Sequence, residues 1–354
     1  MKVFVKGNEA IAEAAVRAGC RFFAGYPITP QNEVPEYMSR RLAEVGGHFV
    51  QGESEVASIN MVYGAASVGT KAMTSSSSPG ISLKSEGISS LAAAELPAVI
   101  INVMRGGPGV GSIQAAQMDY FQSTRAVGHG GHRLLVYAPS TVQETVDCVV
   151  KAFDKAEEYK TPVMVCADGC IGAMMEPVVF PEMREVKPMK VDNTFARTIF
   201  NPNHKHITTL IVPDSKQEEF NRILEKKYDT WREKEVMVEE YLLEDAEVLV
   251  TAYGTIARVA KDAVKQLRTK GVKAGLIRPI TLFPFPYYSF EKINYKRLKG
   301  IVNAEMSIPP QFLEDVSIGV ARRAEITSVL HTAGIIHSPD EIIQAVNAVM
   351  KKGE

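Results

Sequence analysis

Residues 99–109 read VIINVMRGGPG, a short and mostly apolar run that stops at an arginine and a glycine-rich turn. Such a run, bounded by turn residues, is typical of a strand buried on both faces of a parallel sheet. Comparable strands alternate with segments of helical spacing on both sides of it, and this alternation predicts a doubly wound parallel α/β domain over residues 1–185. The expected strands are 3–5, 20–25, 48–51, 71–74, 99–104 and 162–167, and the expected helices are 8–18, 32–45, 55–68, 82–94 and 141–158.

The alternation resumes after residue 245 and predicts a second, smaller α/β domain over residues 245–354. Residues 186–244 form the expected linker, and an irregular stretch over 181–200 leads into it. Residues 214–247 carry 12 acidic and six basic residues with one apolar stripe, and this pattern predicts a long charged surface helix. The helix fits a docked linker better than a coiled-coil arm, because three turns of stripe are too few for a coiled coil.

Composition excludes several classes of protein. The 354 residues include 40 Lys and Arg against 41 Asp and Glu, so the chain lacks the basic excess of nucleic-acid-binding proteins. Four scattered cysteines do not make a disulfide framework. The N-terminus lacks the pattern of a signal peptide, and the chain has no apolar run long enough to span a membrane. These features predict a cytoplasmic enzyme or enzyme subunit that contacts neither nucleic acid nor membrane.

Polar residues follow the expected strands of the first domain at the points where ligands bind in parallel sheets. They are the YPIT segment at 26–29, Glu53 or Glu55, the serines 75–78 and Arg105. A hydroxyl, a carboxylate and a guanidinium at one crevice suit a small carboxylate substrate and a polar cofactor. Arg105 is the best candidate to bind the carboxylate, because its planar fork matches two carboxylate oxygens.

Each of these residues also has a structural interpretation. Glu55 could be a first-turn acid favoured by the helix dipole. Arg105 could be a structural ion-pair partner, and the serines 75–78 could be a solvated loop. Residues 106–111 lack the ending of a phosphate-binding P-loop, and Cys166 and Cys170 have the wrong spacing for a metal knuckle. We therefore expect no metal site in this chain.

Several motifs together resemble the alpha subunit of 2-oxoacid:ferredoxin oxidoreductases. In the first domain they are GYPITP at 25–30, QGESEVASINMVYGAASVG at 51–69, MTSSSSPGISLKSEGI at 73–88 and VMRGGPGVG at 103–111. In the second domain they are AYGTIAR at 252–258, IRPITLFPFP at 277–286 and AEMSIPPQFLEDV at 304–316. The resemblance covers both domains in the same order, and residues 225–247 look more like the branched-chain, 2-oxoisovalerate type than the 2-oxoglutarate type.

The resemblance implies a thiamine diphosphate (ThDP) fold, with a pyrimidine-binding first domain and a second domain like the C-terminal domain of transketolase. It places the family's glutamate on Glu55, where a hydrogen bond to the pyrimidine N1′ would favour the imino tautomer that removes the thiazolium C2 proton. It also places Pro27 and Thr29 beside Glu55 at the cofactor, and Thr29 with Arg105 at the carboxylate and carbonyl of the substrate. Proline residues flanking Thr29 would hold it rigid.

The same resemblance shows what this chain lacks. The diphosphate half of a ThDP site carries a Gly-Asp-Gly motif that holds Mg²⁺, and only Ala167-Asp168-Gly169 approaches it. Four cysteines at these spacings cannot bind a 4Fe–4S cluster. The resemblance therefore implies that Mg²⁺ and the clusters belong to partner chains, namely a beta subunit with the diphosphate half-site, a gamma subunit and a ferredoxin-like subunit.

The implied reaction is the oxidative decarboxylation of a branched 2-oxoacid, with transfer to coenzyme A and electrons passed to ferredoxin. The same reaction on 2-oxoglutarate is the alternative, since the residues of the distal pocket cannot be identified from sequence. A non-catalytic scaffold subunit is a second alternative, although the presence of Glu55, Thr29 and Arg105 argues against it. A nucleotide-dependent dehydrogenase would rest only on the glycine-rich segment 106–111.

Overall fold

The computed structural model describes residues 2–125, 127–186 and 207–352. Its larger part is an eight-stranded sheet in which five neighbouring pairs run parallel, as the strand–helix alternation predicts. Two antiparallel strands are added to this sheet: β13 pairs with β7, and β6 (Ser112–Ala115) pairs with β5. The order of the main path is β13 (Thr281–Phe283), β7 (Leu135–Tyr137), β8 (Pro162–Asp168), β5 (Ala98–Gly106), β4 (Ala72–Ser76), β2 (Phe22–Gly25) and β3 (His48–Gln51).

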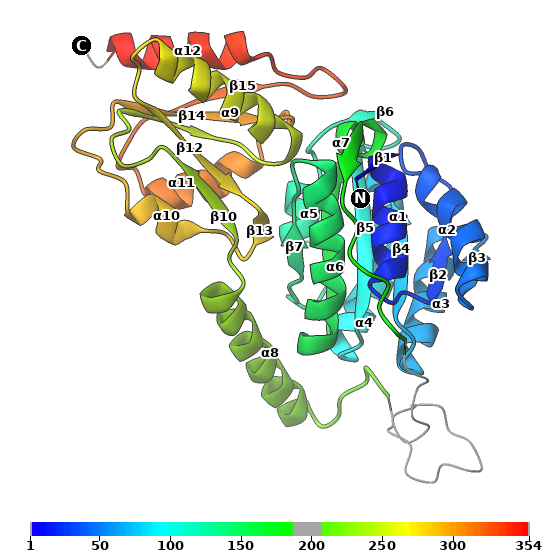
Figure 1. Ribbon diagram of the computed structural model, residues 1–354. Coiled ribbons are helices and arrows are strands. Elements are labelled where there is room, and N and C mark those ends of the chain that lie inside the picture. Colours follow the sequence, from blue (N-terminus) through cyan, green and yellow to red (C-terminus); the bar gives the residue numbers. More distant parts are fainter. Residues whose placement is uncertain (1, 126, 187–206, 353–354) are drawn as a thin grey trace, which may run out of the picture.

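Helices cover both faces of this sheet (Figure 1). On one face, α1 (Gly7–Arg17), α2 (Glu33–Glu44) and α6 (Val142–Tyr159) share an apolar core with the strands. On the other face, α3 (Glu55–Ser67) and α4 (Ser78–Ala93) pack against each other and the sheet. The prediction of a doubly wound fold is confirmed. The smaller elements are α5 (Tyr120–Thr124), α7 (Gly169–Ala173) and the antiparallel pair β1 (Val3–Lys6) and β9 (Met175–Val178).

The second sheet has five strands, of which four run parallel. α9 (Gly254–Thr269) and α12 (Pro339–Lys352) pack in one apolar core of this sheet. α11 (Phe312–Val320) and α10 (Tyr287–Glu291) pack into the core that also contains α3 and α4 of the first sheet. The strand order is β10 (Val238–Tyr241), β12 (Ala274–Pro279), β11 (Val248–Thr251), β14 (Gly300–Glu305) and β15 (Ile326–Leu330).

The linker helix α8 spans Asp214–Lys234, so the expected helix over 214–247 is too long. After a short connection the chain forms β10, which adds an antiparallel edge to the second sheet. Most of the expected irregular stretch 181–200 lies outside the described residues. The docked arrangement of α8 is confirmed, because Leu224, Tyr228 and Trp231 are buried in the core of the first domain.

The two domains are joined by buried hydrogen bonds around Gln117. Its side chain donates to the main-chain oxygen of Tyr253 at 2.8 Å and accepts from the main-chain nitrogen of Met306 at 3.0 Å. Its main chain bonds the same two residues, since its nitrogen donates to Met306 oxygen and its oxygen accepts from the Tyr253 hydroxyl. Gln117 is fully buried, so it holds the second domain against the first.

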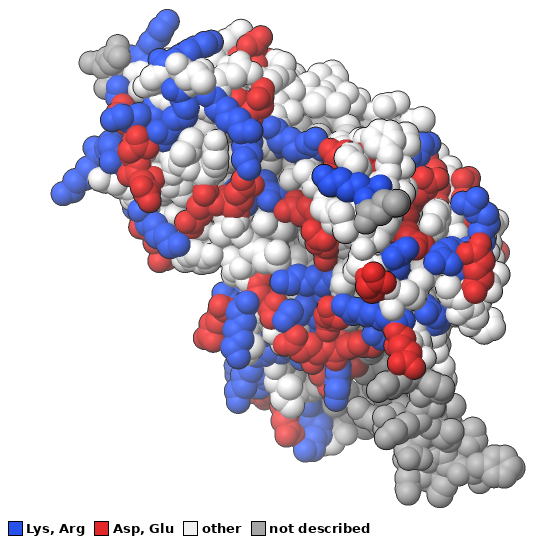
Figure 2. Space-filling model, viewed as in Figure 1, with Lys and Arg blue, Asp and Glu red and all other residues white. Residues whose placement is uncertain are grey.

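The outer surface mixes both signs of charge. Figure 2 shows basic and acidic side chains interspersed over the visible face of both sheets and along α8. In the described part of the chain, no helix is long and apolar enough to cross a membrane.

Candidate active site

The candidate site lies at the carboxyl edge of the first sheet. Strands β3, β2, β4 and β5 are neighbours and run parallel, so the segments that follow them meet at one edge. The sequence placed its candidate residues in these segments. Residues 26–30 follow β2, Glu55 begins α3 after β3, and Arg105 is next to last in β5.

Arg105 and Thr29 are brought together directly. The Nη1 atom of Arg105 donates to the main-chain oxygen of Thr29 at 2.9 Å, and Nη2 donates to the main-chain oxygen of Val110 at 3.2 Å. Arg105 is only 7% exposed, and within the described residues no carboxylate lies within ion-pair distance of it. The structural ion-pair interpretation of Arg105 is therefore wrong, and its charge is available to an anionic ligand.

The Nε atom of Arg105 is buried and has no hydrogen-bond partner among the described residues. Thr29 is exposed, and so is Pro27 in the same loop. The guanidinium thus keeps one unused donor inside the protein, next to a loop whose threonine is exposed. A small carboxylate at this loop would meet a positive charge that no carboxylate of the described residues neutralises.

A polar network below Arg105 fixes the end of β5 against the start of α4. The main-chain nitrogen of Arg105 donates to Ser78 Oγ at 3.0 Å, and that hydroxyl donates to Asp119 at 2.6 Å. Asn102 also donates to Asp119, at 3.0 Å. Burial raises the pKa of Asp119, while these hydrogen bonds and the charge of Arg105 oppose the rise.

Glu55 is buried at the start of α3, whereas Glu53 is exposed. Ser54 caps the helix by accepting from the main-chain nitrogen of Ala57 at 3.2 Å. The Glu55 carboxylate lies against Gly80 of α4, where an added Cβ would come within 2.8 Å of Glu55 Oε1 and 2.0 Å of Ser76 Oγ. Glycine is required here because any side chain would displace the carboxylate.

Serines 75–78 are all buried, so the solvated-loop interpretation is wrong. β4 continues to Ser76 and α4 begins at Ser78, because Pro79 is compatible with the first turn of a helix. The hydroxyls of Ser76 and Ser77 are buried without a partner among the described residues. Unpaired polar groups beside Glu55 indicate a surface that a polar ligand completes.

Lys84 is a site residue that the sequence analysis missed. It lies one helical turn after Gly80 on α4 and is fully buried. Its Nζ donates to the main-chain oxygen of Glu55 at 3.4 Å. Burial lowers the pKa of Lys84 to about 8, and the charge of Glu55 opposes that decrease. An isolated lysine in a small-residue helix carries no local signal that it is buried against a carboxylate.

The other motifs have structural roles. The glycines 106–111 join β5 to β6 in a hairpin rather than preceding a helix, so they do not form a P-loop. Asp168 caps α7 and accepts from both the nitrogen and the hydroxyl of Thr255, which joins the domains. Burial raises the pKa of Asp168. No metal-binding group of three or more His, Cys, Asp or Glu occurs within the described residues.

Comparison with known proteins agrees with this architecture. Residues 13–240 match the model of the pyruvate flavodoxin/ferredoxin oxidoreductase family, described as thiamine-diphosphate-binding. Residues 246–342 match core domain II of pyruvate:ferredoxin oxidoreductase.

Curated relatives and solved structures agree as well. The chain is 50% identical to ketoisovalerate oxidoreductase subunit VorB of Methanothermobacter thermautotrophicus, over 80% of each chain. It is 37% identical to 2-oxoglutarate synthase subunit KorA of Methanocaldococcus jannaschii, over 98% of this chain and all of that one. The structure of 2-oxoglutarate:ferredoxin oxidoreductase from Magnetococcus marinus superposes on this chain with a TM-score of 0.87 at 25% identity. The superposition covers 99% of this chain and 65% of that one.

The fold and these matches define a thiamine-diphosphate-binding type of oxidoreductase. More narrowly, the chain belongs to the alpha-type subunits of the 2-oxoacid:ferredoxin oxidoreductases. The resemblance seen in the sequence is confirmed for the family, the fold class and the enzymatic nature of the chain.

The residues present fit one half of a ThDP site. A buried carboxylate and two unpaired hydroxyls face the carboxyl edge of the sheet, and they suit the polar nitrogens of an aminopyrimidine. Asp168 does not offer a comparable site for the diphosphate group and its Mg²⁺. All the bonds at its carboxylate are made to α7 and Thr255.

Proposed function

We propose that this chain is the alpha subunit of a complex that oxidatively decarboxylates a branched-chain 2-oxoacid, 2-oxoisovalerate, to its coenzyme A thioester, with electrons passing to ferredoxin. The observation that carries the substrate is the 50% identity to ketoisovalerate oxidoreductase subunits, against 37% to a 2-oxoglutarate synthase subunit. The observation that carries the chemistry is the meeting of Glu55, Thr29 and Arg105 at one edge.

In this proposal Arg105 binds the carboxylate of the substrate. Two of its nitrogens are held by main-chain oxygens, so the side chain is already oriented before substrate arrives. The positive charge of Arg105, which no carboxylate of the described residues neutralises, then attracts the anion. The exposed hydroxyl of Thr29 is placed to donate to the neighbouring carbonyl oxygen, and Pro27 contributes to the cofactor side of the same loop.

Glu55 is proposed to hold a proton at the pyrimidine N1′ position. When bound, ThDP supplies the group that stabilises the negative charge left after CO₂ departs. The carboxylate suits its task because it is buried and accepts no hydrogen bond from the described residues. A buried carboxylate forms stronger hydrogen bonds than one in water, since the surrounding dielectric constant is low.

The half-site needs a cover, which we assign to a beta subunit carrying the diphosphate half and its Mg²⁺. Three exposed apolar residues lie next to residues of the site, two of them in sequence and one through a hydrogen bond. Val56 is 47% exposed beside Glu55, Leu83 is 54% exposed beside Lys84, and Val110 is 80% exposed where it bonds Arg105. Apolar surface around a polar site is typical of an interface. The 4Fe–4S clusters belong, in this proposal, to the gamma and ferredoxin-like subunits of a cytoplasmic complex.

The proposal is tested on the complex purified from its source cells. Copurifying chains are identified by mass spectrometry, and bound ThDP is measured by extraction. The complex is then assayed with 2-oxoisovalerate and 2-oxoglutarate. We expect kcat/KM at least about tenfold higher for 2-oxoisovalerate, since rejecting a second carboxylate from an apolar pocket is worth more than 1.4 kcal/mol. The reverse order would replace the proposed substrate by 2-oxoglutarate.

The Glu55→Gln variant tests the catalytic site. It keeps the shape of the side chain but cannot hold a proton on a carboxylate, so we expect kcat to fall by roughly 100-fold or more. The matched control is Glu53→Gln, because Glu53 is two residues away and exposed. Equal activity of the two variants would favour a scaffold role for this chain.

A further inference from the structure

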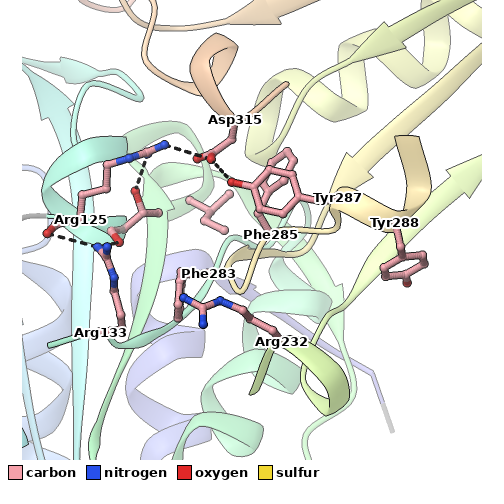
Figure 3. Close-up of a pocket in the computed structure, with 10 residues that line it drawn as sticks. Arg125, Arg133, Arg232, Phe283, Phe285, Tyr287, Tyr288 and Asp315 are labelled. Carbon is pink, nitrogen blue, oxygen red and sulfur yellow. Dashed lines mark hydrogen bonds and ion pairs between the residues drawn. The ribbon is translucent and has the colours of Figure 1, made fainter. Parts of the chain in front are cut away.

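A pocket of about 300 Å³ opens between the two domains, on the opposite edge of the first sheet from the candidate active site. Arg133 precedes β7, and Phe283 of β13 pairs with Val136 of β7, so the pocket lies at the amino end of that strand. Figure 3 shows three arginines and several aromatic rings directed into it from α5, α8, β13 and the segments around them. Its volume is at the lower end of the range for small-ligand sites.

The pocket carries an excess of positive charge. Its lining contains Arg125, Arg133 and Arg232 but only one carboxylate, that of Asp315. Asp315 is already engaged, since it pairs with Arg125 at 3.0 Å and accepts from the hydroxyls of Tyr120 and Tyr287. Arg232 has a carboxylate partner outside the lining, Asp229, so the charge that no carboxylate of the described residues neutralises is that of Arg133.

Arg133 has no carboxylate within ion-pair distance in the described part of the chain. Its Nη1 donates to the main-chain oxygens of Thr124 at 3.0 Å and Arg125 at 3.4 Å, which leaves other guanidinium donors free for a ligand. Arg232 pairs with Asp229 on α8, and its side chain is 53% exposed. Two partly free guanidinium groups from separate elements suit an anion with several oxygens, such as a phosphate.

Aromatic rings accompany this charge. The guanidinium groups of Arg133 and Arg232 lie 5.6 and 5.7 Å from the centroid of the Phe283 ring. Tyr287 is 37% exposed in the lining, whereas the ring of Tyr288 is turned away from the arginines (Figure 3) and lies 4.6 Å from the ammonium group of Lys292. Exposed aromatic rings beside arginines provide stacking surfaces for a planar base.

We propose that this pocket binds a nucleoside phosphate, with the phosphate held by Arg133 and Arg232 and the base stacked on Tyr287. The proposal does not depend on the ThDP site, because none of the lining residues belongs to that site. The chemistry is that of a free nucleotide or of the adenosine phosphate head group of coenzyme A. Either ligand would bridge the first domain and the second at their seam.

The test is isothermal titration of the full chain with ADP, inorganic diphosphate and coenzyme A. We expect ADP to bind, and Arg133→Gln to weaken it at least about tenfold through loss of a charge-assisted hydrogen bond. Arg232→Gln, a change at an exposed side chain, is expected to weaken it about threefold or more. The matched control is Arg222→Gln on the solvent face of the same helix, where the side chain is 67% exposed. This control is expected to bind ADP like the unchanged chain.

Three results would overturn the proposal. The first is the absence of ADP binding at millimolar concentration, and the second is ADP binding that neither arginine variant weakens. The third is inorganic diphosphate binding as tightly as ADP, which would remove the role of the base. The coenzyme A titration separates the two sources: sensitivity to Arg133→Gln assigns the pocket to its head group, and insensitivity assigns it to a free nucleotide. Circular dichroism of each variant checks that the fold is retained.

Discussion

At the scale of single residues, the candidate site depends on two cations with different surroundings. Arg105 is held by main-chain oxygens at the carboxyl edge of the sheet, and no carboxylate of the described residues pairs with it. Lys84 is fully buried, and its nearest partner is the main chain of Glu55. One is arranged for binding an anion, while the other sits in the protein interior beside the proposed catalytic carboxylate.

Arg105→Lys preserves the charge but removes the fork that bonds Thr29 and Val110. We expect the KM for the 2-oxoacid to rise by roughly 10- to 100-fold in the assembled complex, equivalent to one charged hydrogen bond. The matched control is Arg21→Lys, because Arg21 also donates two main-chain bonds but lies at the amino edge of the same sheet. Steady-state kinetics measure both, and an unchanged KM in Arg105→Lys would contradict substrate binding by this residue.

Lys84 makes the stability of the chain depend on pH. The pKa of Lys84 is about 8 in the folded chain, against an ordinary value of 10.5. Between pH 8 and pH 10.5, Lys84 is therefore protonated in the unfolded chain but largely neutral in the folded chain. Stability therefore rises with pH across this window, and charging Lys84 costs the folded state about 3 kcal/mol at neutral pH. The prediction concerns the difference in the free energy of unfolding between the unchanged chain and Lys84→Met. This difference should increase by about 3 kcal/mol from pH 7 to pH 11, in favour of the unchanged chain.

Urea unfolding at several pH values measures this difference. Lys226→Met is the control, because Lys226 is an exposed lysine on α8. A difference for Lys84→Met that stays constant with pH would show that Lys84 is not forced to lose its proton by burial.

At the scale of elements, local pattern explains most of the fold. The expected strand at 48–51 has the same bounds in the structure as β3, because glycines directly before and after it limit its length. The pattern missed β10 and β13, whose partners lie far along the chain. β13 joins the first sheet through β7 although it follows the second domain's β12, and a three-residue strand carries no signal for so distant a partner. The same limit applies to Lys84, since burial is set by tertiary packing.

α8 is stabilised by packing rather than by its own sequence. Trp231 is fully buried, and the centroid of its ring lies 5.6 Å from that of Tyr159 and 5.0 Å from that of Tyr228. Trp231→Ala is expected to lower the free energy of unfolding by about 3–5 kcal/mol, as for other large buried aromatic residues. Ile223→Ala on the same helix is the control, because Ile223 is 50% exposed and should cost far less. Equal costs in chemical denaturation would mean that α8 is an undocked arm in solution.

At the scale of the whole molecule, the two domains act as one unit because buried polar groups cross between them. The proposed nucleotide pocket lies on this seam, and Asp168 and Gln117 bond across it nearer to the carboxyl edge of the first sheet. The candidate catalytic residues all come from the first domain, so the second domain contributes by holding the first sheet and its loops in place. A change at the seam should therefore affect stability before it affects chemistry.

Gln117→Leu tests this coupling. The leucine fits the space, but it leaves the main-chain nitrogen of Met306 buried without a partner among the described residues. It also removes one of the two hydrogen bonds to the main-chain oxygen of Tyr253, which still accepts from the nitrogen of Ala257. One buried group without a partner costs roughly 1–3 kcal/mol and the lost bond to Tyr253 about 1 kcal/mol more, so we expect the urea midpoint to fall clearly. Gln114→Leu is the control, because Gln114 is exposed on β6, three residues away. If both variants unfold at the same midpoint, the Gln117 hydrogen bonds do not hold the domains together, and apolar packing alone must join them.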